Sequence, residues 1–74
     1  MRTQFESIEE YFEEIQKDGG LQGLSLQPIV KRDLRKIALK KSEGYRSLIV
    51  TNFMSYNEMQ AFLFGYRAHQ INKL

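Results

Sequence analysis

The stretch from Arg35 to Asn52, RKIALKKSEGYRSLIVTN, decides the fold. Its second half, residues 45–52, is rich in β-branched residues and has the strongest strand pattern in the chain. One strand alone cannot pair its backbone groups, and residues 35–41 offer a second strand. The residues between them, 41–45, include Gly44 and are typical of a hairpin loop. We therefore predict a β-hairpin.

The segment 29–44 also admits a helical interpretation, in which Pro28 would suit the first turn. One helical face would then carry four apolar residues: Val30, Leu34, Ile37 and Ala38. In that helix, however, Leu39 would point away from the apolar face and Lys41 would point into it. A strand instead turns Ile37 and Leu39 to the same side. The need for a pairing strand favours the hairpin, and the predicted architecture depends on this choice.

A helix is predicted before the hairpin. Thr3-Gln4-Phe5-Glu6 fits a capping box, and Ser7-Ile8-Glu9-Glu10 fits it one turn later, so two starts stay open. The helix carries an apolar stripe formed by Phe5, Ile8, Tyr11, Phe12 and Ile15. It is expected to end at Asp18-Gly19-Gly20, because glycine readily takes the left-handed conformation. Residues 19–28 are predicted to be a connection.

A second helix is predicted after the hairpin. The sequence Ser55-Tyr56-Asn57-Glu58 is a capping box, and Met54 and Met59 can form a hydrophobic staple across it. One face of this helix carries Met59, Phe62, Leu63 and Tyr66, and a second apolar face carries Phe64, Ala68 and Ile71. Gly65 in mid-helix costs about 1 kcal/mol relative to alanine, which suggests a close backbone approach there. The second face is either a partner interface or is covered by the first helix.

These elements predict a single α+β domain over residues 1–74, in the order helix, strand, strand, helix. Two helices pack on one face of a small antiparallel hairpin sheet. A chain of this size buries only about 60% of its unfolded surface. The chain has no cysteine and a single histidine, so disulfides and a Cys/His metal site are excluded. Self-association is then the remaining way to stabilise so small a core. We expect a homodimer with Phe64, Ala68 and Ile71 at its interface.

Charge is sorted along the chain. Residues 1–18 carry six acidic residues against Arg2 and Lys17, a net charge of −4. Residues 31–46 carry seven basic residues against Asp33 and Glu43, a net charge of +5. The net charge of +2 therefore hides a strongly dipolar charge distribution. Such a distribution affects how the molecule binds and orients its partners more than it affects the fold.

The basic region is the first candidate binding surface, for nucleic acid or an acidic partner. Its members are Lys31, Arg32, Arg35, Lys36, Lys40, Lys41 and Arg46. In the predicted hairpin, Lys36, Lys40 and Arg46 lie opposite the inward-facing aliphatic residues. A basic two-stranded ribbon can enter a major groove or lie along phosphates. The alternatives are that these cations only keep an exposed sheet edge soluble, or that the acidic helix neutralises them.

An enzyme is not expected, because convergent reactive groups are missing. The chain lacks cysteine and a glycine-rich phosphate loop, and its lone His69 is expected to be a solvated helical residue. The pairs Glu9/Glu13 and Glu10/Glu14 share helical faces and could hold a hard cation, although a solvated polar face explains them as well. We assign no catalytic, cofactor-binding or metal-binding residue.

The run GYRSLIVTN, residues 44–52, followed by SYNEMQAFLFGY, residues 55–66, resembles small uncharacterised proteins of phages and mobile elements of Gram-positive bacteria. The likeness is a short hairpin followed by a capped helix that ends in an aromatic-Gly-Tyr step. It covers about a third of the chain and implies no catalytic or binding residue. What it implies is a regulatory or host-interaction role.

The function predicted from the sequence is a small binding or regulatory protein that acts through protein–protein contacts. The alternative is a small nucleic-acid-binding regulator that uses the basic residues between positions 31 and 46. No apolar run approaches the roughly 18 residues of a membrane span, and the N-terminal segment is acidic, unlike a signal peptide. We expect a soluble cytoplasmic protein with no membrane contact.

Overall fold

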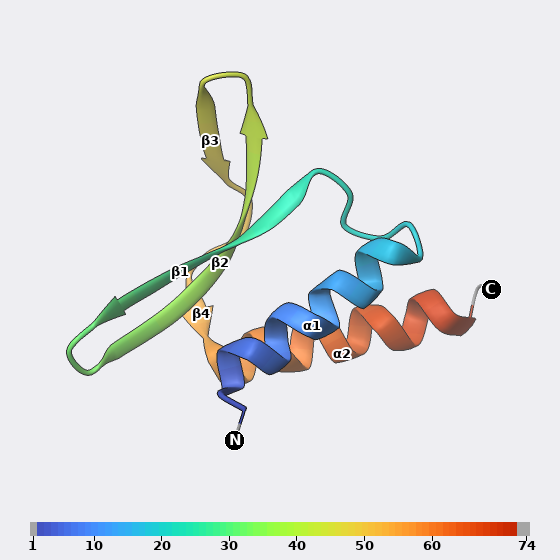
Figure 1. Ribbon diagram of the computed structural model, residues 1–74, viewed down its shortest axis with the longest axis horizontal. Helices are drawn as coiled ribbons and strands as arrows, with labels where there is room; N and C mark the ends of the chain where they lie inside the picture. Colours follow the sequence, from blue (N-terminus) through green and yellow to red (C-terminus); the bar gives the residue numbers. More distant parts are fainter. Residues whose placement is uncertain (1, 73–74) are drawn as a thin grey trace.

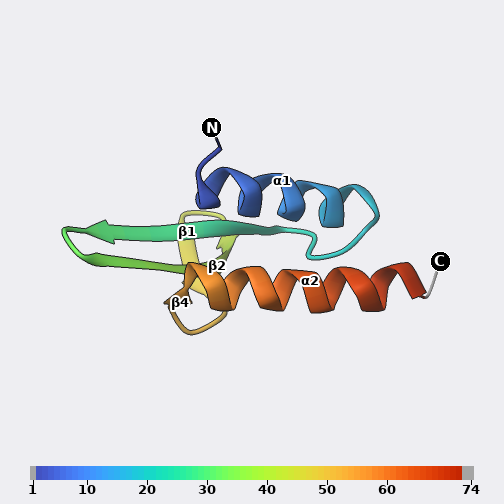
Figure 2. The same cartoon turned by 90° about the horizontal axis from the view of Figure 1, so that it is seen from below.

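A long central strand organises the fold. In a computed structural model, which describes residues 2–72, two helices and a four-stranded antiparallel sheet form an α+β arrangement (Figure 1). The elements in chain order are α1 (Gln4–Lys17), β1 (Leu24–Lys31), β2 (Leu34–Glu43), β3 (Arg46–Ile49), β4 (Met54–Ser55) and α2 (Tyr56–Asn72). The two helices run side by side in the same direction, as the two views show together (Figures 1 and 2). The predicted fold class is therefore confirmed.

The hairpin over residues 35–52 is present as β2 and β3. Glu43 pairs with Arg46, so the loop is only the two residues Gly44 and Tyr45, and Gly44 has the positive φ of 59° that glycine tolerates. The helical alternative for residues 29–44 is wrong.

The connection predicted over residues 19–28 is wrong in its second half, because β1 begins at Leu24. This strand pairs with β2 from Leu24 opposite Lys41 to Lys31 opposite Leu34. Pro28 sits in the middle of β1, where it lacks an N–H for a sheet hydrogen bond. An edge strand tolerates proline, and β1 is at the edge of the sheet.

The other edge of β2 is shared by two strands. Its residues 40–43 pair with β3, and Lys36 and Ile37 pair with the short β4. Between these two ladders, Leu39 keeps its backbone satisfied: its N–H donates to the Thr51 hydroxyl at 3.0 Å, and its carbonyl accepts from Val50 N–H at 2.8 Å. The chain can therefore leave β3 and return as β4 without leaving a buried donor unpaired.

The core lies between the sheet and the two helices. Its fully buried side chains come from all three parts: Ile8, Phe12 and Ile15 of α1, Ile37 and Leu39 of β2, and Met59 and Leu63 of α2. The inward direction predicted for Ile37 and Leu39 is thus confirmed. The apolar stripe of α1 also faces this core, with Phe5 and Tyr11 partly buried at its margin.

Both helices begin where the capping boxes predicted. The Thr3 hydroxyl accepts from Glu6 N–H at 3.1 Å, which settles the first of the two possible starts for α1. In α2, the Ser55 hydroxyl accepts from Glu58 N–H at 3.1 Å, and the Glu58 carboxylate accepts from Ser55 N–H at 3.2 Å. These reciprocal bonds satisfy N–H groups that a helix start otherwise leaves free.

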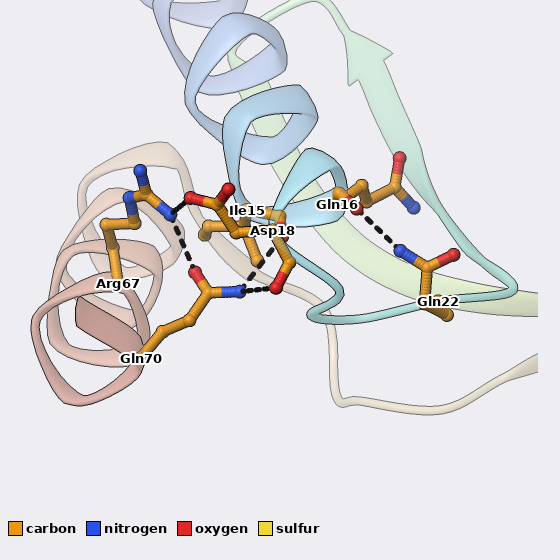
Figure 3. A network of polar contacts seen from close by, with 6 residues as sticks. All are labelled: Ile15, Gln16, Asp18, Gln22, Arg67 and Gln70. Atoms are coloured by element: carbon orange, nitrogen blue, oxygen red, sulfur yellow. Dashed lines mark hydrogen bonds and ion pairs between the residues drawn. The ribbon is translucent and has the colours of Figure 1, made fainter. Parts of the chain in front are cut away.

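Polar side chains fasten the end of α1 to α2 (Figure 3). Gln70 Nε2 donates to the carbonyl of Ile15 at 3.0 Å and to that of Asp18 at 3.2 Å, so two carbonyls at the helix end gain partners. The Arg67 guanidinium pairs with the Asp18 carboxylate and also donates to Gln70 Oε1 at 3.0 Å. On the other side of α1, Gln22 Nε2 donates to the Gln16 carbonyl at 2.6 Å.

Two glycines differ in how closely the chain surrounds them. Gly20 is buried, and a Cβ there would lie 2.7 Å from both Gln70 Nε2 and Tyr66 Cε1 and 2.8 Å from Ile15 Cγ2. A Cβ on Gly65 would meet no atom within 4 Å. The close approach predicted at Gly65 therefore does not occur within this chain.

This difference predicts opposite effects of the same substitution. Gly20→Ala should lower the free energy of unfolding by about 1–3 kcal/mol, because the added methyl overpacks the helix junction. Gly65→Ala should raise it by about 1 kcal/mol, because alanine is the better helix former. Urea denaturation of both variants beside the unaltered chain measures the two effects. Equal shifts in the same direction would contradict this packing.

The capping box of α2 predicts a pH dependence. The hydrogen bond from Ser55 N–H holds the pKa of Glu58 below its ordinary value, with smaller help from the Ser55 hydroxyl and Lys36. A lowered folded-state pKa contributes stability above the unfolded pKa, and that contribution is lost as the pH falls through the folded value. Glu58→Gln should therefore flatten the loss of stability on acidification. Glu13→Gln, which removes a carboxylate outside this capping box, is the matched control.

Candidate functional site

The structure divides the seven predicted basic residues between two hairpins. Lys31, Arg32, Arg35 and Lys36 lie in the β1–β2 hairpin, and Lys40, Lys41 and Arg46 lie in the β2–β3 hairpin. The two hairpins project from the helices in different directions (Figure 1). The end of the first one, residues 29–36, is called the β1–β2 arm below. The cations therefore form two surfaces and not the single cluster that sequence proximity suggested.

The predicted face of one cation is wrong. Lys36 and Lys40 lie on the side of β2 opposite Ile37 and Leu39, as predicted, because successive residues of a strand alternate. Arg46, however, pairs with Glu43, which has the same parity on β2 as Ile37 and Leu39. The two-residue turn fixes this register, and a shift of one residue moves a side chain to the other face.

These basic side chains remain largely without acidic partners. Within residues 2–72, the only ion pair that involves one of them joins Lys41 to Glu43 at 3.2 Å, inside the same hairpin. The other two ion pairs of this part of the chain are Arg2 with Glu10 and Arg67 with Asp18. No ion pair joins the acidic residues of α1 to the cations of the sheet. Direct neutralisation by the acidic helix, one of the alternatives left open above, is thus not seen.

Three consecutive aliphatic residues at the end of β3 and directly after it are exposed. Leu48, Ile49 and Val50 are 49%, 48% and 53% exposed, although the sequence predicted an aliphatic side buried beneath the cations. That prediction is wrong because the core cluster ends at Leu39 and does not extend under β3. The sequence contained a signal for this: three consecutive aliphatic residues cannot all face one side of a strand.

The backbone of β3 also has free hydrogen-bonding groups. β3 pairs with β2 on one side and is the last strand in the sheet order. Val50 N–H donates to the Leu39 carbonyl, so alternation turns the backbone groups of Leu48 and Arg46 toward β2. Those of Ser47 and Ile49 then point outward, away from the sheet. The edge thus combines exposed aliphatic side chains with unpaired donors and acceptors.

The second apolar face of α2 is partly covered. The Phe64 ring packs edge-on against Tyr11 of α1 at a centroid distance of 4.7 Å, yet Phe64 is still 48% exposed. Ala68 is exposed, and so is Ile71 near the end of the helix. The first helix therefore covers one member of the predicted interface in part and leaves Ala68 and Ile71 uncovered.

Two further features are absent among residues 2–72. No group of three or more His, Asp or Glu side chains comes together there in a way that could hold a metal ion. In this same part of the chain, neither helix is both long and apolar enough to span a bilayer.

The sequence matches no protein-family model, and searches of curated proteins and of solved structures found no match either. The surface of this chain offers four features for binding: two basic hairpins, an open strand edge and a partly covered helix face.

Proposed function

We propose that this chain is a non-enzymatic binding protein that acts through protein–protein contacts, and that its β3 edge pairs with β3 of a second copy. The observation that carries this proposal is that Leu48 and Ile49 of β3, and Val50 directly after it, are exposed beside the outward backbone groups of the same strand. Such an edge is a template for another strand. A contact of this kind also adds buried surface to a small core.

A two-fold axis at Leu48 gives a self-complementary pairing. In an antiparallel pair centred there, Ser47 lies opposite the partner's Ile49, and Ile49 lies opposite the partner's Ser47. Both residues have outward backbone groups, so four main-chain hydrogen bonds can form. Leu48 then faces the partner's Leu48 in a non-hydrogen-bonded pair, where side chains approach most closely. One surface on each copy suffices, as a two-fold dimer requires.

Repulsion between the positive charges near this edge does not prevent the pairing. The nearest cation on the strand is Arg46, which would lie opposite the partner's Val50. The two copies of Arg46 are then four residues apart along the ribbon, roughly 14 Å. That distance exceeds the Debye length of about 8 Å at physiological ionic strength, so their repulsion is largely screened.

Two variants test this pairing. Ile49→Pro removes an outward N–H without removing a bond to β2, so it should give a folded monomer where the unaltered chain sediments as a dimer. Leu48→Lys places two ammonium groups at the axis, so its dimer should weaken most at low salt. Analytical ultracentrifugation, with circular dichroism as the folding control, measures both.

Phe64→Glu is the discriminating control, because it alters the helix face and leaves β3 intact. The β3 proposal expects this variant to remain a dimer. A monomer from Phe64→Glu together with a dimer from Ile49→Pro would place the interface on α2 and reject the strand pairing. A monomeric unaltered chain at millimolar concentration would reject self-association altogether.

Nucleic-acid binding is the second candidate, and the unpaired cations of the two hairpins favour it. Six of the seven basic residues have no ion-pair partner within residues 2–72. The β1–β2 arm is a two-stranded ribbon, and a major groove about 12 Å wide admits such a ribbon. Phosphate contacts by Lys36 and Arg32 would supply affinity without sequence preference.

A salt titration tests this candidate. If the arm binds phosphates, the logarithm of the affinity for duplex DNA or RNA should fall linearly with the logarithm of the salt concentration. Arg32→Glu with Lys36→Glu should abolish binding measured by fluorescence anisotropy. Arg2→Glu with Lys17→Glu changes the net charge equally but lies in the acidic segment, so it should retain most of the affinity. No binding by the unaltered chain at low salt would rule this candidate out.

A further inference from the structure

A groove separates the β1–β2 arm from the beginnings of the two helices. It has a volume of about 460 Å³. Phe5 and Tyr56 line it from the helices, Val30 and Arg35 line it from the arm, and Pro28 lines it from the part of β1 directly before the arm. The arm extends past the start of both helices, so this part of the sheet has no helix beneath it (Figures 1 and 2).

The apolar lining follows from strand alternation. Leu24, Leu26, Pro28 and Val30 share one side of β1, and the first two pack against the core. Neither helix extends far enough to cover Pro28 and Val30. Pro28 is therefore half-buried, and Val30 is 63% exposed. On the opposite wall, the Phe5 and Tyr56 rings lie 6.1 Å apart at a tilt of 40°. The groove therefore offers aliphatic and aromatic surface on facing walls.

Arg35 is the only charged residue that lines the groove. It pairs with Val30 across the two strands, which places both on the side of the sheet that faces the helices. Arg35 has no ion-pair partner within residues 2–72. Several other polar groups of the lining are already engaged: Thr3 and Ser55 accept cap bonds, and Gln4 Nε2 donates to Asn57 Oδ1 at 2.6 Å. The Arg35 guanidinium, which is free to pair with an anion, therefore lies beside an apolar surface.

We propose that this groove binds a small aromatic carboxylate. The ring would lie between the Phe5–Tyr56 pair and the Pro28–Val30 wall, where stacked or edge-on contacts are favourable. The carboxylate would accept a bidentate pair of hydrogen bonds from Arg35, whose planar fork matches its geometry. The volume lies in the range of pockets that hold small molecules. None of the residues that line this site belongs to β3, so the site does not depend on the proposed dimer.

Three ligands that share a ring and differ in charge test the proposal: 3-phenylpropanoate, 3-phenylpropan-1-ol and 3-phenylpropan-1-amine. Titrations of isotopically labelled protein, followed by amide chemical shifts, should show saturable changes at Phe5, Val30, Arg35 and Tyr56 with the carboxylate. The alcohol should bind at least tenfold more weakly, and the amine should cause no saturable change. Equal affinity for the acid and the alcohol would overturn the role of charge.

Variants of the arm complete the test. Arg35→Gln should weaken carboxylate binding at least tenfold, and Val30→Asp should abolish it by adding a negative charge to the wall. Lys31→Gln is the matched control: it removes a cation from the same arm, but from the other side of the sheet, so binding should be unchanged. All three positions are exposed, and circular dichroism should show an unaltered fold. Undiminished binding by Arg35→Gln, or no saturable shift at millimolar carboxylate, would reject the site.

Discussion

The fold depends on hydrogen-bond partners for the backbone of β2, the central strand of the sheet. The middle of this ten-residue strand, Ile37–Leu39, is buried, and its backbone groups need partners on both edges because unpaired groups inside a protein are costly. β1 supplies one edge, whereas β3 and β4 share the other with a crossing segment between them. At that crossing, Leu39 bonds to Thr51 and Val50 and also presents its side chain to the core. Sheet pairing and core packing therefore meet in one residue, and both helices take their positions from the surface that β2 presents.

The features that the sequence predicted correctly are local in origin. The capping boxes at Thr3 and Ser55 and the turn at Gly44 depend on residues three or four positions apart, so short windows contain their signal. β1 was missed although its leucines alternate with polar residues, because Pro28 argues against a strand unless the strand is known to lie at an edge. The face of Arg46 and the exposure of β3 depend on register and on where the helices end, which are long-range properties.

The candidate surfaces follow from an offset between the two layers. The sheet and the helices overlap only in part, so the β1–β2 arm and the β2–β3 hairpin both project beyond the core (Figures 1 and 2). Most of the basic residues lie on these projecting parts, and five of the nine acidic residues lie on α1. Because no ion pair within residues 2–72 joins these two groups, the charge separation read from the sequence persists in the folded molecule. The groove beside Arg35 and the apolar edge at Leu48 are both uncovered for the same reason.

Pro28 has a consequence for how far assembly can grow. When two β3 edges pair, the enlarged sheet is bounded on both sides by β1, and no further β3 edge is available. A proline in the middle of each outer strand interrupts the row of donors that another strand would need, and Lys31 adds charge at the end of the same strand. In the proposed dimer, the two outer β1 strands are therefore poorly suited to pair with further strands, which opposes polymerisation into fibres.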